Sequence, residues 1–126
     1  MKRFIISIVL FAVTVAACVA ETFFLNNFVT SFTEEINYAI DETAAQNLES
    51  ANHVAQDISN RWQEQQSFIS TFINHDRLEE IGQTIISLKT FLEQGQIEDF
   101  LVESEVAKVQ LNHLKDTELP TIENIL

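Results

Sequence analysis

The sequence predicts an all-α protein in which an N-terminal transmembrane or signal helix precedes an antiparallel three-helix bundle with one long first helix. Glycine and proline occupy only three of 126 positions, far fewer than the turns of a sheet protein require. Apolar side chains recur every three or four residues over most of the chain, which is the period of a helix face. The single cysteine excludes an intramolecular disulfide and a cysteine-based zinc cage.

The charge balance limits the classes of partner. The chain carries 7 Lys and Arg against 19 Asp and Glu, a formal net charge of −12. Binding of nucleic acid needs clustered cationic side chains that displace counterions, so we expect no nucleic-acid partner. A length of 126 residues accommodates one folded domain.

The N-terminus has the pattern of a membrane anchor. Residues 4–20 carry no charge and follow Met1, Lys2 and Arg3; as a helix they span about 25 Å, the lower end of what a bilayer core needs. Basic residues before the span and acidic residues after it predict a cytoplasmic N-terminus and an outer C-terminal domain. We therefore divide the chain into an anchor with its juxtamembrane segment, 1–30, and an extracytoplasmic helical domain, 31–126.

Two other interpretations fit the same residues. A basic start, an apolar core and small residues also resemble a cleavable signal peptide. Val15, Ala16, Ala17 and Cys18 resemble a lipobox, which makes Cys18 a candidate lipidation site, although an unmodified cysteine is also an ordinary apolar residue of a span. All three interpretations place the rest of the chain outside the cytoplasm.

Three helices are expected in the outer domain, at about 32–74, 77–94 and 97–118. Short connections between them predict antiparallel neighbours. The tail at 121–126 is apolar, and we expect it to pack against the helical domain. The starts and stops are signalled by capping and breaking residues: Ser31 with Glu34, Asp76 with Glu79, Gly95, and Pro120. The first helix carries a coiled-coil-like heptad seam: Ala44, Leu48, Ala51, Ala55, Ile58, Trp62, Ile69 and Phe72.

Length arithmetic predicts an exposed stripe on the first helix. The first helix would be roughly 65 Å long, whereas the second returns only about 27 Å. Ile36, Ile40, Ala44 and Leu48 would then lack an intramolecular neighbour, so we expect this stripe to bind a second copy or another membrane or envelope protein. A bend near Asn60 would instead double the first helix back and make a four-helix bundle.

The third helix has two apolar faces. Its main face continues the bundle seam, while Val102, Val106 and Val109 follow one another at helical spacing on an adjoining face. This pattern indicates that the helix is covered on two sides.

The sequence contains no recognisable catalytic arrangement, so we expect no enzyme activity, no cofactor and no metal. His53 and Asp57 lie four residues apart and could bind a metal weakly, but a solvated helix surface is the better interpretation. The favoured function is a membrane-tethered helical interaction module. The alternative is an extracytoplasmic sensing bundle that holds a ligand of unknown chemistry near Trp62, Phe68 and Phe72.

Several short stretches carry a resemblance to a known family: Arg61-Trp62, Ile73-Asn74-His75, Asn112-His113-Leu114 and Glu123-Asn124-Ile125-Leu126. With the basic-flanked span, the chain resembles the bacterial domain-of-unknown-function family 4363 over essentially its whole length. The resemblance implies a small single-span envelope protein of Gram-positive-type bacteria, without assigned activity or catalytic residues. The lipobox at Cys18 is not a feature of that resemblance.

Overall fold

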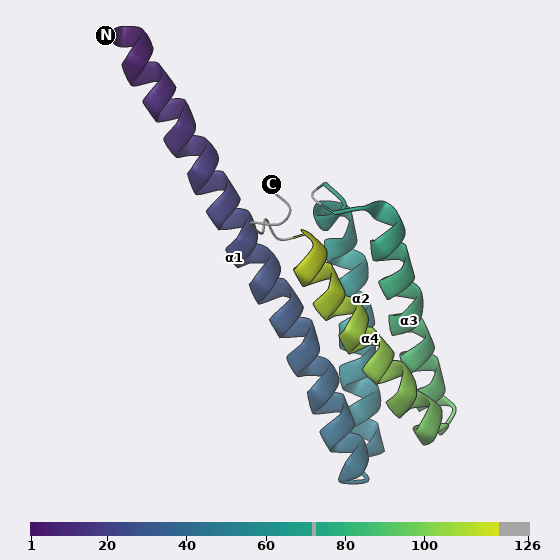
Figure 1. Ribbon diagram of the computed structural model, residues 1–126. Coiled ribbons are helices and arrows are strands. Elements are labelled where there is room, and N and C mark those ends of the chain that lie inside the picture. Colours follow the sequence, from purple (N-terminus) through teal and green to yellow (C-terminus); the bar gives the residue numbers. More distant parts are fainter. Residues whose placement is uncertain (72, 119–126) are drawn as a thin grey trace.

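The computed structural model describes residues 1–71 and 73–118, which form four α-helices and no strand. In chain order these are α1 (Lys2–Ala44), α2 (Leu48–Ile69), α3 (His75–Glu93) and α4 (Ile97–Glu118) (Figure 1). The all-α class and the long, apolar first helix are confirmed, and α4 has the expected bounds. The predicted tail contacts at 121–126 lie outside the described residues.

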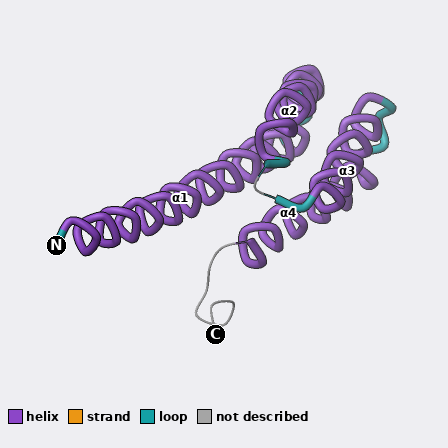
Figure 2. The backbone as a smooth tube through the Cα atoms, turned by 90° about the horizontal axis from the view of Figure 1, so that it is seen from above, coloured by secondary structure: helices purple, strands orange, loops and turns teal. Residues whose placement is uncertain are grey.

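The helices pack as an antiparallel bundle. Each helix contacts the next along the chain, and α4 closes the ring against α1, whereas the described residues of the diagonal pairs do not pack together. The bundle has four helices, not three, because the second half of α1 is one of them. The first half of α1 projects beyond the other three helices (Figure 2).

The expected single helix over 32–74 is wrong, because the chain turns between Ala44 and Leu48. The bend that we considered near Asn60 does not occur either, since α2 is continuous there. The chain therefore doubles back, but earlier than the sequence indicated. As a result α2 runs alongside the second half of α1 and covers it.

A Schellman motif makes this turn. Gln46 has a φ of 62°, in the left-handed region. The Asn47 N–H donates to the Glu42 carbonyl at 2.8 Å, and the Gln46 N–H donates to the Thr43 carbonyl at 3.0 Å. These two bonds satisfy carbonyls that the end of a helix would otherwise leave open.

The helix restart that Ser31 and Glu34 indicated is absent. α1 is unbroken through both residues and through Asn26 and Asn27, because it contains no glycine or proline to stop it. Ser31 accepts a hydrogen bond from Arg61 of α2 at 3.1 Å instead of capping a helix. The boundary drawn between 30 and 31 thus lies inside α1.

The cap of α3 also differs from the expectation. Asn74, not Asp76, is the N-cap, and its side-chain oxygen accepts the Asp76 N–H at 2.9 Å. At the other end of α3 the prediction is confirmed, because Gly95 follows the last turn with a φ of 74°.

The core runs the length of the bundle. The predicted seam residues from Ala51 to Ile69 are buried. Ala44 and Leu48 lie beside the turn and are exposed, and Phe72 is outside the described residues. The α1 contribution begins at Leu25. The main core side chains of α1 and α2 are Leu25, Phe28, Val29, Phe32, Ile36, Ala51, Ala55, Ile58, Trp62 and Ile69.

Within the described part of the chain, one helix is long and apolar enough to cross a membrane, and that helix is α1. None of its most apolar 18-residue stretch is buried in the bundle. A single helix thus joins an exposed apolar half to a half that belongs to the core.

Candidate functional site

The outward side of α4 is apolar although no described helix covers it. Val102, Val106 and Val109 are 62%, 39% and 65% exposed and follow one another at spacings of four and three. They lie opposite the side of α4 that faces the core. We call these three residues the valine face. The core side of the same helix consists of Phe100, Ser104, Ala107, Leu111 and Leu114.

Exposed carboxylates border the valine face. Glu98 and Asp99 precede Val102 by four and three residues, and Glu105 precedes Val109 by four, so each lies beside a valine on the helix surface. The nearby Lys108 offsets the charge of Glu105 but not those of Glu98 and Asp99. Its ammonium pairs with Glu105 at 2.8 Å and donates to Asn37 of α1 at 2.9 Å.

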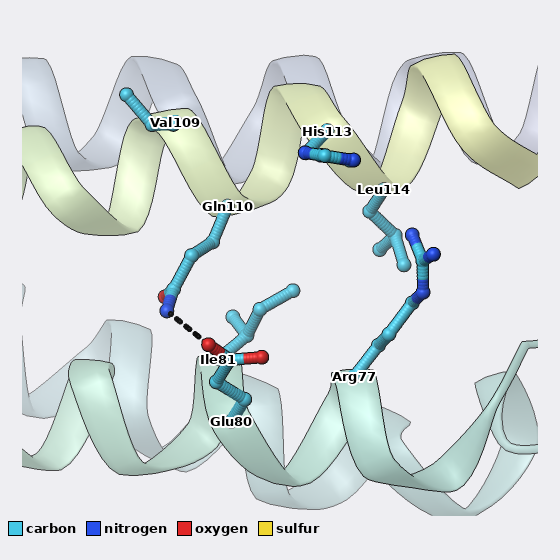
Figure 3. Close-up of a pocket in the computed structure, with 7 residues that line it drawn as sticks. All are labelled: Arg77, Glu80, Ile81, Val109, Gln110, His113 and Leu114. Atoms are coloured by element: carbon cyan, nitrogen blue, oxygen red, sulfur yellow. Dashed lines mark hydrogen bonds between the residues drawn. The ribbon is translucent and has the colours of Figure 1, made fainter.

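A polar recess adjoins the valine face at Val109 (Figure 3). It lies between α3 and α4, has a volume of about 340 Å³ and is lined by both helices. Gln110 donates to the Glu80 carboxylate across it at 3.4 Å, while the Gln110 side-chain oxygen is buried without a hydrogen-bond partner. Figure 3 shows Arg77 extending from α3 towards α4. The recess therefore offers donors and acceptors beside an apolar surface.

A family model described as "Domain of unknown function (DUF4363)" matches residues 19–125. The chain belongs to this family. The matched region covers the described bundle and leaves out most of the exposed half of α1. Comparison with curated proteins and with solved structures finds no match to this chain.

The four residues of the stripe predicted on the first helix do not form a single exposed surface in this DUF4363 protein. Ile36 is completely buried, Ile40 packs partly buried against the core, and Ala44 and Leu48 are exposed at the turn. The early turn at Gln46 explains the difference, because it brings α2 alongside Ile36. α2 therefore covers much of the stripe, and the helix lengths give no reason to expect a partner protein at these residues.

Trp62 and Phe68, the two described residues of the sensing alternative, lie in different surroundings, and Phe72 is outside the described residues. Trp62 is buried, with its ring centroid 5.7 Å from that of Phe28 and 5.5 Å from that of Phe32. Phe68 is 57% exposed and meets Phe24 of α1 edge-on at 5.5 Å. A hollow of about 190 Å³ adjoins Trp62, and a separate one adjoins Phe68.

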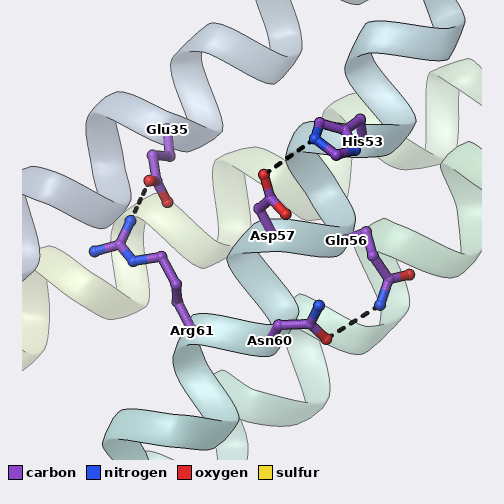
Figure 4. Close-up of polar contacts among 6 residues, drawn as sticks. All are labelled: Glu35, His53, Gln56, Asp57, Asn60 and Arg61. Atoms are coloured by element: carbon purple, nitrogen blue, oxygen red, sulfur yellow. Dashed lines mark hydrogen bonds and ion pairs between the residues drawn. The ribbon is translucent and has the colours of Figure 1, made fainter.

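The polar pairs on α2 are surface contacts (Figure 4). His53 lies 3.5 Å from Asp57, with both side chains more than half exposed. Arg61 forms an ion pair with Glu35 and stacks over the Phe32 ring at 4.7 Å, which joins α2 to α1. Among the described residues no three His, Cys, Asp or Glu side chains are grouped to hold a metal ion.

The sequence identified the residues of the valine face but not their role. Their helical spacing indicated a second covered side of α4, and the structure leaves that side open. Cys18, the candidate lipidation site, is exposed on the apolar half of α1. Its exposure is compatible with a residue of a span and with a modified cysteine.

Proposed function

We propose that this protein is a membrane-tethered helical module that stands outside the cytoplasm and binds another envelope protein through the valine face of α4. The first half of α1 is the tether. Lys2 and Arg3 precede the span, while all 19 acidic residues and the other five basic residues follow it, a net charge of −14 on the far side. This asymmetry favours a cytoplasmic N-terminus.

The observation that carries the proposal is the exposure of three valines in a row on one helix. Single exposed apolar residues are common, but a continuous apolar ridge with a polar border is typical of an interaction site. The core side of α4 is buried, whereas Glu98, Asp99 and Glu105 beside the valines are exposed. The valine face is therefore an apolar surface of the bundle that the packing of its own described helices does not explain.

The charges around the valine face favour a different protein over a second copy. In a symmetric dimer with the two α4 helices parallel, the carboxylates of Glu98 and Asp99 would face their own copies. Like charges across an interface are unfavourable, whereas a complementary rim speeds association and sets specificity. We infer a partner that presents an apolar ridge bordered by Lys and Arg.

Site-specific photo-crosslinking in intact cells of the source organism tests this proposal. A photoreactive amino acid at Val106 should give an adduct with one protein, and the same residue at Glu64, which is exposed on α2, should not. Val102→Asp combined with Val109→Asp should abolish the adduct at Val106 while the helical content stays unchanged. Higher salt should lower the yield, because salt screens the rim charges.

Two results would contradict the proposal. If Val106 crosslinked only to a second copy of this chain, the valine face would mediate self-association and not binding of another protein. Equal adducts from Val106 and Glu64, or adducts that survive both Asp substitutions, would remove the valine face as the docking surface.

A further inference from the structure

An apolar groove lies where α1 leaves the bundle. Ala17, Ala20 and Phe24 of α1 form one wall, and Phe68 at the end of α2 and Ile73 beyond it form the other. The volume is about 390 Å³, within the range of sites that hold small molecules. Glu21 is the charged residue among the described residues of its lining.

The shape of the groove follows from residue size. Ala17 and Ala20 stand one turn apart and leave the surface of α1 hollow, while the ring of Phe24 closes the end near the bundle by meeting Phe68 edge-on at 5.5 Å. Ile73 is buried and forms part of the floor. Phe68 remains 57% exposed even after this contact.

The position of the groove indicates what fills it. Ala17 and Ala20 belong to the uncharged run of residues 4–20, the part of α1 that we place in the bilayer. The groove therefore starts at membrane depth and ends at the bundle, and lipid is the apolar medium beside it. Phe24 and Phe68 are exposed at its outer end, and phenylalanine is among the apolar residues that interfacial helices bury at the boundary of headgroups and acyl chains.

We propose that the acyl chain of a lipid from the outer leaflet occupies this groove and seats the bundle on the membrane surface. The inference rests on the membrane placement given under Proposed function. Glu21 at the groove and the net charge of −14 beyond the span repel anionic headgroups. The occupant is therefore a zwitterionic lipid.

Fluorescence quenching by brominated acyl chains tests the proposal in the full-length chain. Trp62 is the only tryptophan, so Trp62→Phe provides a dark background for a reporter at Phe68→Trp. In vesicles of phosphatidylcholine with brominated acyl chains, this reporter should lose fluorescence. A reporter at Leu48→Trp, at the opposite end of the bundle, should not. Ala20→Phe fills the groove and should restore the fluorescence of the Phe68→Trp reporter.

Flotation with the vesicles distinguishes a failure of the membrane placement from a failure of the groove proposal. A chain that does not float with them contradicts the membrane placement itself. A chain that floats but shows no quenching at Phe68→Trp, or the same quenching with Ala20→Phe, overturns the groove alone. Stronger quenching by brominated phosphatidylglycerol than by phosphatidylcholine overturns the assignment of a zwitterionic lipid.

A second measurement does not depend on the tryptophan substitutions. Native mass spectrometry of the wild-type chain released from phosphatidylcholine nanodiscs should detect one retained lipid, and Ala20→Phe should lose it. Equal retention by the two chains would contradict the proposal.

Discussion

Gly82 of α3 is placed where the indole of Trp62 comes closest. A β-carbon at this position would lie 3.0 Å from Trp62 Nε1 and 3.5 Å from Cδ1. The indole cannot easily retreat, because the rings of Phe28 and Phe32 pack on it at 5.7 and 5.5 Å. The glycine that weakens α3 thus makes room for the largest side chain of the core.

Because of this contact, we predict that Gly82→Ala destabilises the wild-type chain but stabilises a chain in which Trp62 is replaced by Phe. In the wild-type chain the added methyl group should lower the free energy of unfolding by about 1 kcal/mol, because overpacking outweighs the gain in helix propensity. In a Trp62→Phe background the same substitution should raise it by roughly 0.5–1 kcal/mol. Urea unfolding of the four chains measures the difference, and equal effects of Gly82→Ala in both backgrounds would show that Trp62 does not require the glycine.

At the scale of elements, the same Schellman motif ends α1 and α3 with different residues. After α3 the Gln96 N–H donates to the Phe91 carbonyl at 2.9 Å, around the left-handed Gly95. After α1 the left-handed residue is Gln46. Glycine adopts this conformation readily, whereas other residues do so at a cost of roughly 1–2 kcal/mol.

This difference explains what the sequence could predict. The end of α3 carries a glycine, so the turn there was predictable. The end of α1 carries Ala45, Gln46 and Asn47. Asn47 is the one common capping residue among them, and the apolar spacing continues past it into Ala51 and Ala55. The turn forms because the bundle gains more by packing α2 on α1 than the strained glutamine costs. That balance is tertiary and cannot be found in local sequence.

Substitutions at the two turns should therefore act in opposite directions. Gln46→Gly should raise the free energy of unfolding by about 0.5 kcal/mol, the relief of backbone strain less the entropy of a freer unfolded chain. Gly95→Ala should lower it by about 1 kcal/mol. Thermal unfolding followed by circular dichroism tests both, and a loss of stability with Gln46→Gly would argue against the left-handed turn.

At the scale of the whole molecule, one helix, α1, combines an exposed apolar half with a half buried in the bundle. The heptad spacing of the bundle was predictable, and so was the apolar run of residues 4–20. Their junction was not, because a capping pattern at Ser31 and Glu34 concealed an unbroken helix whose core contacts begin at Leu25. The candidate site was likewise only partly predictable from the sequence. The spacing of the valines was visible in the sequence, but which side of α4 stays open depends on the contact between α4 and α1.

Two fragments should differ sharply in stability. Residues 22–126 retain the whole buried part of α1, whereas residues 31–126 lack Leu25, Phe28 and Val29, each at most 7% exposed. Burial of such side chains contributes about 1.5–3 kcal/mol each, so the shorter fragment loses much of the roughly 5–15 kcal/mol typical of a domain. Urea unfolding should show a cooperative transition for 22–126 and a far earlier one for 31–126. Coincident transitions would place the start of the bundle beyond residue 30.

The continuity of α1 from the span into the bundle is the central claim, and one distance measures it. Cys18 is the only cysteine, so a second one at Asp41→Cys, exposed on the same helix, allows a pair of spin labels in the full-length chain in nanodiscs. An unbroken helix predicts a single narrow distance distribution near 35 Å, about 1.5 Å for each residue between them. A broad distribution, or one centred at a much shorter distance, would reveal a hinge at Asn26 and Asn27 and contradict the account.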